Sequence, residues 1–144
     1  MVLLVDAPLT PAFQVIPELH ALVIETDDPW LMIQKVPTAF QIDRENAPTF
    51  VGMPHGIDEV ARLATYLHIH VPSPIEHYYR WPRERTLIPE VLVHQKTSAG
   101  FLTVNPRSYC LNGIGTGKTV TALWAADYLM EMGCVHSALI DVPL

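Results

Sequence analysis

Residues 112–119 have the types and spacing of a loop that binds the phosphates of a nucleoside triphosphate. Glycines in such a loop let consecutive backbone N–H groups turn toward the phosphates, while the helix that follows directs its positive end at them. The residues predicted to surround the phosphates are Gly113, Gly115, Thr116 and Gly117. Lys118 would reach the β- and γ-phosphates as a point charge, and the Thr119 hydroxyl would be a ligand of the Mg²⁺ ion that accompanies ATP.

The first position of this loop departs from the common pattern, which begins with glycine. Asn112 stands there, so a glycine-rich turn before an ordinary helix is the alternative interpretation. The flanking residues favour the phosphate loop. Residues 108–111 have the pattern of a short buried strand, and the residues from Lys118 onward have that of a helix. The motif requires this order of strand, loop and helix.

The elements around the loop are predicted to alternate between helix and strand. Apolar residues at helical spacing indicate a helix that begins near Glu90 and stops near Asn105. A second helix is predicted from Lys118 to Met132, a stretch without proline or glycine, and Gly133 is placed to end it. Residues 137–142 have the pattern of a strand, which would close a strand-helix-strand unit.

Most of the 13 prolines in the chain precede Arg83, and proline does not fit inside a helix or a central strand. The first half of the chain is therefore predicted to consist of short strands and irregular segments. Residues 20–25 and 30–36 are expected to form a hairpin around a turn at Asp27-Asp28-Pro29. Two further strands are predicted at residues 39–42 and 49–51, and an amphipathic helix is predicted at residues 56–67. We therefore expect a small α+β accessory domain over residues 1–70 and a proline-rich linker over 71–89.

Composition limits the functions that this chain can carry alone. The net charge of −6 argues against strong binding of nucleic acid, so a role on DNA would need more protein. The basic cluster Arg80, Arg83 and Arg85 could contact a phosphate or form a solvated turn. The isolated thiols of Cys110 and Cys134 fit a reducing cytoplasm, and we expect neither a signal peptide nor a membrane span.

The order of these segments resembles the opening of a Snf-type superfamily 2 helicase, a DNA-dependent ATPase of the kind that bacteriophages encode. The segments that carry the resemblance are Pro89, His94-Gln95-Lys96, residues 111–119, residues 123–129 and residues 139–144. Pro72-Ser73-Pro74-Ile75, Tyr78-Tyr79 and Trp81-Pro82 also resemble the stretch before the motor in those phage proteins. The first loop position is often not glycine in that family, which accounts for Asn112.

This resemblance implies an α+β N-terminal domain followed, over residues 90–144, by the first β-loop-α-β of a RecA-like α/β P-loop lobe. It implies ATP and Mg²⁺ as ligands, the cytoplasm of a bacterial host as the location, and DNA as a partner only within a longer parent. It also implies that Gln95 recognises the adenine edge, since an amide offers a donor and an acceptor together; a helix-surface glutamine is the alternative.

Some features depart from the family pattern. Gly113 and Ile114 stand where an acidic residue and methionine are usual, and Asp141 stands where a small or apolar residue is usual. Hydrolysis needs a later acidic motif and an arginine from a second lobe, so we expect this chain to bind ATP but not to hydrolyse it alone. The alternatives are a truncated helicase-like phage protein that blocks a host defence protein by contact, or a fragment without a role of its own.

Overall fold

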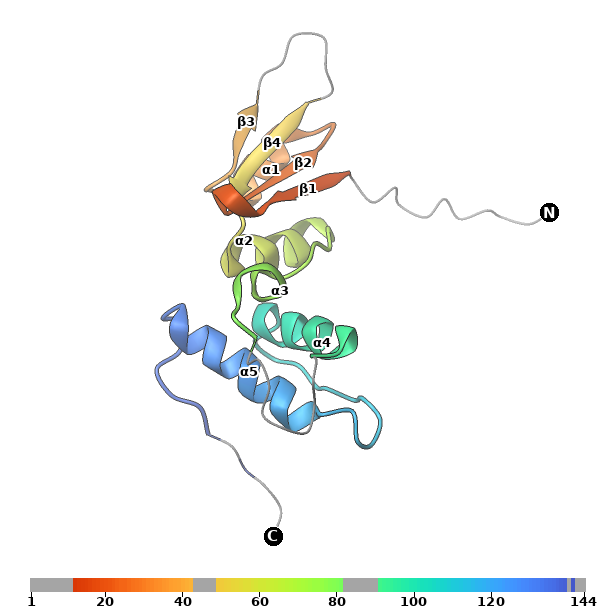
Figure 1. Ribbon diagram of the computed structural model, residues 1–144. Helices are drawn as coiled ribbons and strands as arrows, with labels where there is room; N and C mark the ends of the chain where they lie inside the picture. The colour runs from red at the N-terminus through yellow and green to blue at the C-terminus, as the bar shows by residue number, and fades with distance from the viewer. Residues whose placement is uncertain (1–11, 43–48, 82–90, 140, 142–144) are drawn as a thin grey trace, which may run out of the picture. The chain divides into compact units, whose positions relative to one another are not determined.

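The computed structural model describes residues 12–42, 49–81, 91–139 and 141 (Figure 1). The chain divides into two compact units, Met1–Val71 and Pro72–Leu144, which we call unit 1 and unit 2. Among the described residues, no helix is long and apolar enough to cross a membrane.

Unit 1 is built on a 4-stranded sheet in which neighbouring strands are antiparallel, in the order β1-β2-β4-β3. The strands are β1 Phe13–Ile16, β2 Ala21–Glu25, β3 Phe40–Ile42 and β4 Phe50–Pro54. A short 3-10 helix, η1 Pro17–Leu19, joins β1 to β2, and His20 after it has a left-handed φ of 48°.

The core of unit 1 lies on one face of this sheet, because alternate side chains of a strand point to the same side. Leu22 and Ile24 of β2 stand opposite Met53 and Val51 of β4, and all four are buried. Helix α1, Pro29–Lys35, packs on this face (Figure 1) and contributes the buried Met32. The remaining members of the core cluster are Val36, Ala39, Leu63 and Ile69.

The prediction of a strand at residues 30–36 was wrong, because this segment is helix α1. The side chain of Asp28 caps the helix, its Oδ1 accepting a hydrogen bond of 2.9 Å from the Leu31 N–H. Pro29 follows at the first helical position, where its missing N–H costs nothing. Met32 and Val36 are four residues apart and both are buried, so the apolar spacing is that of a helix.

The other elements predicted for unit 1 are confirmed with small shifts. Strands β2, β3 and β4 each begin one residue later than predicted, and β4 extends to Pro54. The predicted helix begins as α2, Ile57–Arg62, and continues as a π-helical turn, η2 Leu63–Leu67. Strand β1 was not predicted.

Unit 2 is helical in its described part. Helix α3, Pro74–Tyr78, lies where a linker was predicted; residues 82–89 of that linker, with Arg83 and Arg85, fall outside the described residues. Helices α4, Val93–Val104, and α5, Lys118–Glu131, confirm the two predicted helices, and Gly133 follows α5 with a left-handed φ of 71°.

The two strands predicted on either side of α5 are wrong where the structure describes them. Residues 108–111, 137–139 and 141 have no strand conformation, while Ile140 and Val142 lie outside the description. The side chains of Tyr109 and Leu111 are 89% and 91% exposed, the opposite of a buried strand. A strand needs a neighbour to accept its backbone hydrogen bonds, and the described part of unit 2 contains none.

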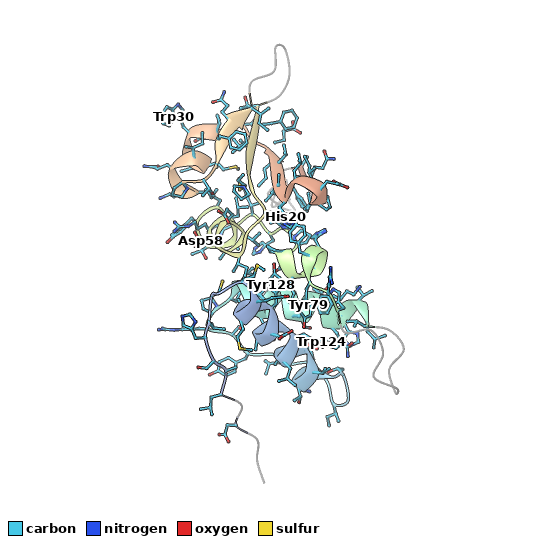
Figure 2. The ribbon with its side chains drawn as sticks, turned by 60° about the vertical axis from the view of Figure 1, so that its left-hand side comes forward. His20, Trp30, Asp58, Tyr79, Trp124 and Tyr128 are labelled. Atoms are coloured by element: carbon cyan, nitrogen blue, oxygen red, sulfur yellow. The ribbon has the colours of Figure 1, made fainter. Side chains whose placement is uncertain are left out.

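An aromatic cluster ties the segment after α3 to α5. Tyr79 meets Trp81 and Tyr128 edge-on at ring-centroid distances of 5.1 and 5.8 Å, and Trp81 meets Trp124 at 5.6 Å. Figure 2 shows Tyr79, Trp124 and Tyr128 gathered together. The Tyr79 hydroxyl donates a hydrogen bond of 2.6 Å to Asp127 Oδ2, so this cluster has a polar anchor as well.

This cluster makes unit 2 sensitive to alkaline pH. Burial raises the pKa of Tyr128 to about 12, and burial with the Asp127 hydrogen bond also raises the pKa of Tyr79. A tyrosine in the unfolded chain ionises at about pH 10. Above that pH the unfolded chain releases protons that the folded chain retains, so the free energy of unfolding is expected to fall as pH rises from about 10 toward 12.

Urea unfolding of unit 2 at a series of alkaline pH values tests this prediction. Tyr128→Phe removes one titrating group and is expected to make the loss of stability with pH shallower. Tyr109→Phe, at an exposed tyrosine of the same unit, is the control and should retain the wild-type slope. Equal slopes in wild type and Tyr128→Phe would contradict the prediction.

Candidate phosphate-binding site

Left-handed glycines shape the segment that enters α5. Gly115 and Gly117 each have φ of 77°, and Gly117 is the N-cap of this 14-residue helix. Residues with a Cβ are disfavoured at such angles, so the glycines allow the backbone to turn tightly into the helix. The Thr116 hydroxyl donates to the Gly113 carbonyl at 2.9 Å across the turn.

The ammonium group of Lys118 lies against the opening of the loop. Its Nζ donates hydrogen bonds of 2.8 Å to the Asn112 carbonyl and 2.7 Å to the Gly113 carbonyl. A lysine ammonium has three N–H donors. The positive charge is therefore held where the loop turns, with donor capacity for a phosphate oxygen beyond these two bonds.

The first turn of α5 adds further groups that favour an anion. The first backbone hydrogen bond of the helix runs from the Thr121 N–H to the Gly117 carbonyl. The N–H groups of residues 118–120 therefore have no acceptor within the helix. The helix dipole adds positive potential at this end. Thr119 is exposed in this turn, where its hydroxyl is accessible to a bound nucleotide and its Mg²⁺.

Gln95 is brought against the loop from α4. It is only 3% exposed, so the helix-surface alternative is wrong. Its Oε1 accepts from the Leu92 N–H at 3.1 Å, and its Nε2 donates to the Thr116 carbonyl at 3.3 Å. A Cβ placed on Gly117 would lie 2.5 Å from this Nε2, so the Gln95 amide would have to move if residue 117 carried a side chain. Adenine recognition by Gln95 stays a prediction.

Two residues of α4 that the sequence did not single out for the site also contact the loop. His94 Nε2 lies 3.3 Å from the Thr116 carbonyl, and Ser98 Oγ accepts a hydrogen bond of 2.9 Å from Asn112 Nδ2. Positions 94, 95 and 98 lie on one side of a helix, because position 98 follows the other two by three or four residues. This spacing is the signal in the sequence that links His94 and Ser98 to Gln95.

An open groove of about 780 Å³ lies between α4 and residues 109–112, the segment that leads into the loop. Its apolar lining includes Leu92 at the N-cap of α4, Val93 and Phe101 of α4, and the exposed Tyr109 and Leu111. Cys110 also lines this groove, and Cys134 is exposed; both are free thiols. Neither thiol belongs to the loop.

The residues present fit a Mg²⁺-nucleotide. Backbone N–H groups, one ammonium and one hydroxyl are the groups that phosphates and their Mg²⁺ require. Among the residues that the structure describes, no group of three or more histidine, cysteine, aspartate or glutamate side chains could hold a metal ion. The hydroxyl of Thr119 is the protein group that could hold a Mg²⁺ ion bound with the phosphates.

Comparisons of the chain with protein-family models, curated proteins and solved structures find no match.

Proposed function

We propose that unit 2 binds ATP with Mg²⁺ through residues 112–119. The observation that carries the proposal is the placement of the Lys118 ammonium on the carbonyls of Asn112 and Gly113, beside two left-handed glycines at the start of α5. A glycine-rich turn without a ligand does not require a lysine ammonium bonded to its carbonyl groups. A phosphate loop needs this positive charge at the point where the β- and γ-phosphates lie.

Each part of the site contributes differently to binding in this proposal. Backbone N–H groups of the loop and of the first turn of α5 hold the phosphates, and Lys118 neutralises their charge. Thr119 positions the Mg²⁺ ion, which supplies charge neutralisation between phosphate oxygens when bound. Gln95 supports the loop through Thr116. The proposal concerns binding and not hydrolysis.

We further propose that this binding unit is the opening of the RecA-like lobe of a phage Snf-type superfamily 2 motor, whose substrate would be DNA. Support comes from the order of Gln95, the loop and α5 along the chain, and from the contact of Gln95 with the loop. Because the net charge of −6 does not favour binding to a phosphate backbone, the proposal assigns DNA binding to other parts of such a motor.

Binding of a fluorescent ATP analogue to wild type and Lys118→Ala tests the nucleotide site. Loss of the ammonium removes charge-assisted hydrogen bonds and is expected to raise the Kd about tenfold to a hundredfold. Lys96→Ala is the matched control, since the Lys96 ammonium lies 5.8 Å from the Trp81 ring centroid instead of on the loop. Equal affinity in wild type and Lys118→Ala, or no binding by wild type, would refute the proposal.

A second candidate function is contact with a host protein without catalysis. The acidic charge and the exposed apolar side chains along the groove favour it, because such side chains are common at protein interfaces. A partner that binds wild type and Lys118→Ala equally well, and Tyr109→Ala weakly, would support this function. Loss of the partner in Lys118→Ala would instead link partner binding to the nucleotide site.

A further inference from the structure

Helix α4 contacts the candidate phosphate loop at two separate places. Ser98 Oγ accepts from Asn112 Nδ2 at the first loop position, while His94 and Gln95 both reach the Thr116 carbonyl at 3.3 Å. One helix thus contacts the loop both where it leaves the preceding segment and shortly before it enters α5. The two contacts together limit how far the loop can open.

The Asn112 end of the loop also determines where the lysine stands. Asn112 uses its side chain to bond Ser98 and its carbonyl to accept from Lys118 Nζ at 2.8 Å. A shift of Asn112 would therefore carry the acceptor of Lys118 with it. A glycine at this position would have no side chain with which to reach α4.

We propose that Asn112 and Ser98 are a positioning pair that fixes the loop in its phosphate-binding shape. This inference rests on the proposed nucleotide function and adds residues to the same site. Both side chains are half-buried, so water competes only in part for their hydrogen bond. Asn112 stands where the common pattern has glycine. It gives up the conformational freedom of glycine and gains a hydrogen bond to Ser98 of α4.

The affinity for ATP reports on the pair. Loss of one neutral hydrogen bond is expected to raise the Kd for a fluorescent ATP analogue about threefold to tenfold in Asn112→Ala and in Ser98→Ala. The double variant should bind no more weakly than either single variant, because both remove the same bond. Ser98→Thr retains a hydroxyl and is expected to bind the analogue as wild type does. A purely structural role for residue 98 would not require a hydroxyl there.

Matched measurements separate this pair from general effects. Thr97→Ala, at the adjacent exposed residue of α4, should leave the Kd unchanged. The melting temperature of the nucleotide-free protein should change little in every variant. Additive losses in the double variant, or unchanged affinity in Asn112→Ala while Lys118→Ala weakens binding, would overturn the pair and leave the nucleotide site standing.

Amide hydrogen exchange in the nucleotide-free protein tests the pair independently of binding. Exchange at residues 112–117 is expected to be severalfold faster in Asn112→Ala and Ser98→Ala than in wild type, with α5 unchanged. Unchanged exchange in the loop would overturn the inference even if no nucleotide bound. Faster exchange without ATP binding would instead refute the proposed function and retain the anchoring role.

Discussion

Replacement of Gly117 by alanine is expected to weaken ATP binding about a hundredfold or more, the largest effect of any single methyl group in the site. Two costs combine at this position. The φ of 77° is left-handed and strains any residue with a Cβ. The new Cβ would also lie 2.5 Å from Gln95 Nε2 and 3.3 Å from Val120 Cγ1, so Gln95 must leave the Thr116 carbonyl.

Gly115→Ala is the control for Gly117→Ala, because Gly115 has the same φ of 77° but no atom within 4 Å of its Cβ position. It carries the backbone strain without the clash and should weaken binding only about tenfold. Combination of Gly117→Ala with Gln95→Ala removes the clash and should recover part of the affinity. Titration with a fluorescent ATP analogue measures all four proteins. Equal effects at 115 and 117 would show that Gln95 does not determine the loop.

Replacement of Leu22 by alanine is expected to destabilise unit 1 by about 3 kcal/mol. Leu22 is 0% exposed in the centre of the sheet and stands opposite the buried Met53. Removal of its branched end leaves a cavity between the sheet and the helices of unit 1. Most of the stability of so small a unit would be lost.

Hydrogen exchange at the amides of β2 and β4 measures this loss of stability in unit 1 directly. Leu19→Ala in η1 is the matched control, because Leu19 is 72% exposed and its truncation should change stability by less than about 0.5 kcal/mol. Wild-type protection of β2 and β4 in Leu22→Ala would contradict the described core.

Local signals in the sequence predicted the elements that depend on local interactions. Helices α4 and α5 carry strong helix formers or an apolar stripe, and β2 is a run of apolar and β-branched residues. The strand prediction failed at α1 because the cap from Asp28 and Pro29 was interpreted as a hairpin turn. Both interpretations use the same residues, and the hydrogen bonds from the Leu31 N–H to Asp28 Oδ1 and from the Val36 N–H to the Met32 carbonyl decide for the helix.

Further errors concern strands, which form only where another segment pairs with them. Strand β1 is defined by its pairing with β2, which its own residues do not reveal. The opposite error occurred at residues 108–111, whose apolar run has no neighbouring strand in the described part of unit 2.

The candidate site divides in the same way between local and distant signals. The glycines, Lys118 and Thr119 are contiguous and were predicted from the motif, and Gln95 was predicted from the resemblance. Ser98 was missed because its contact joins two segments that only the packing of α4 beside the loop brings together.

The aromatic cluster has an optical consequence for this two-unit chain. Of the 3 tryptophans, Trp30 in unit 1 is 79% exposed and points away from it (Figure 2), whereas Trp81 and Trp124 in unit 2 are half-buried and in contact. Unfolding moves an exposed indole from water to water but moves the paired indoles from protein to water. Intrinsic fluorescence will therefore follow unit 2 almost alone, while circular dichroism follows both units. If the two units melt separately, the two optical curves from a single sample will not coincide.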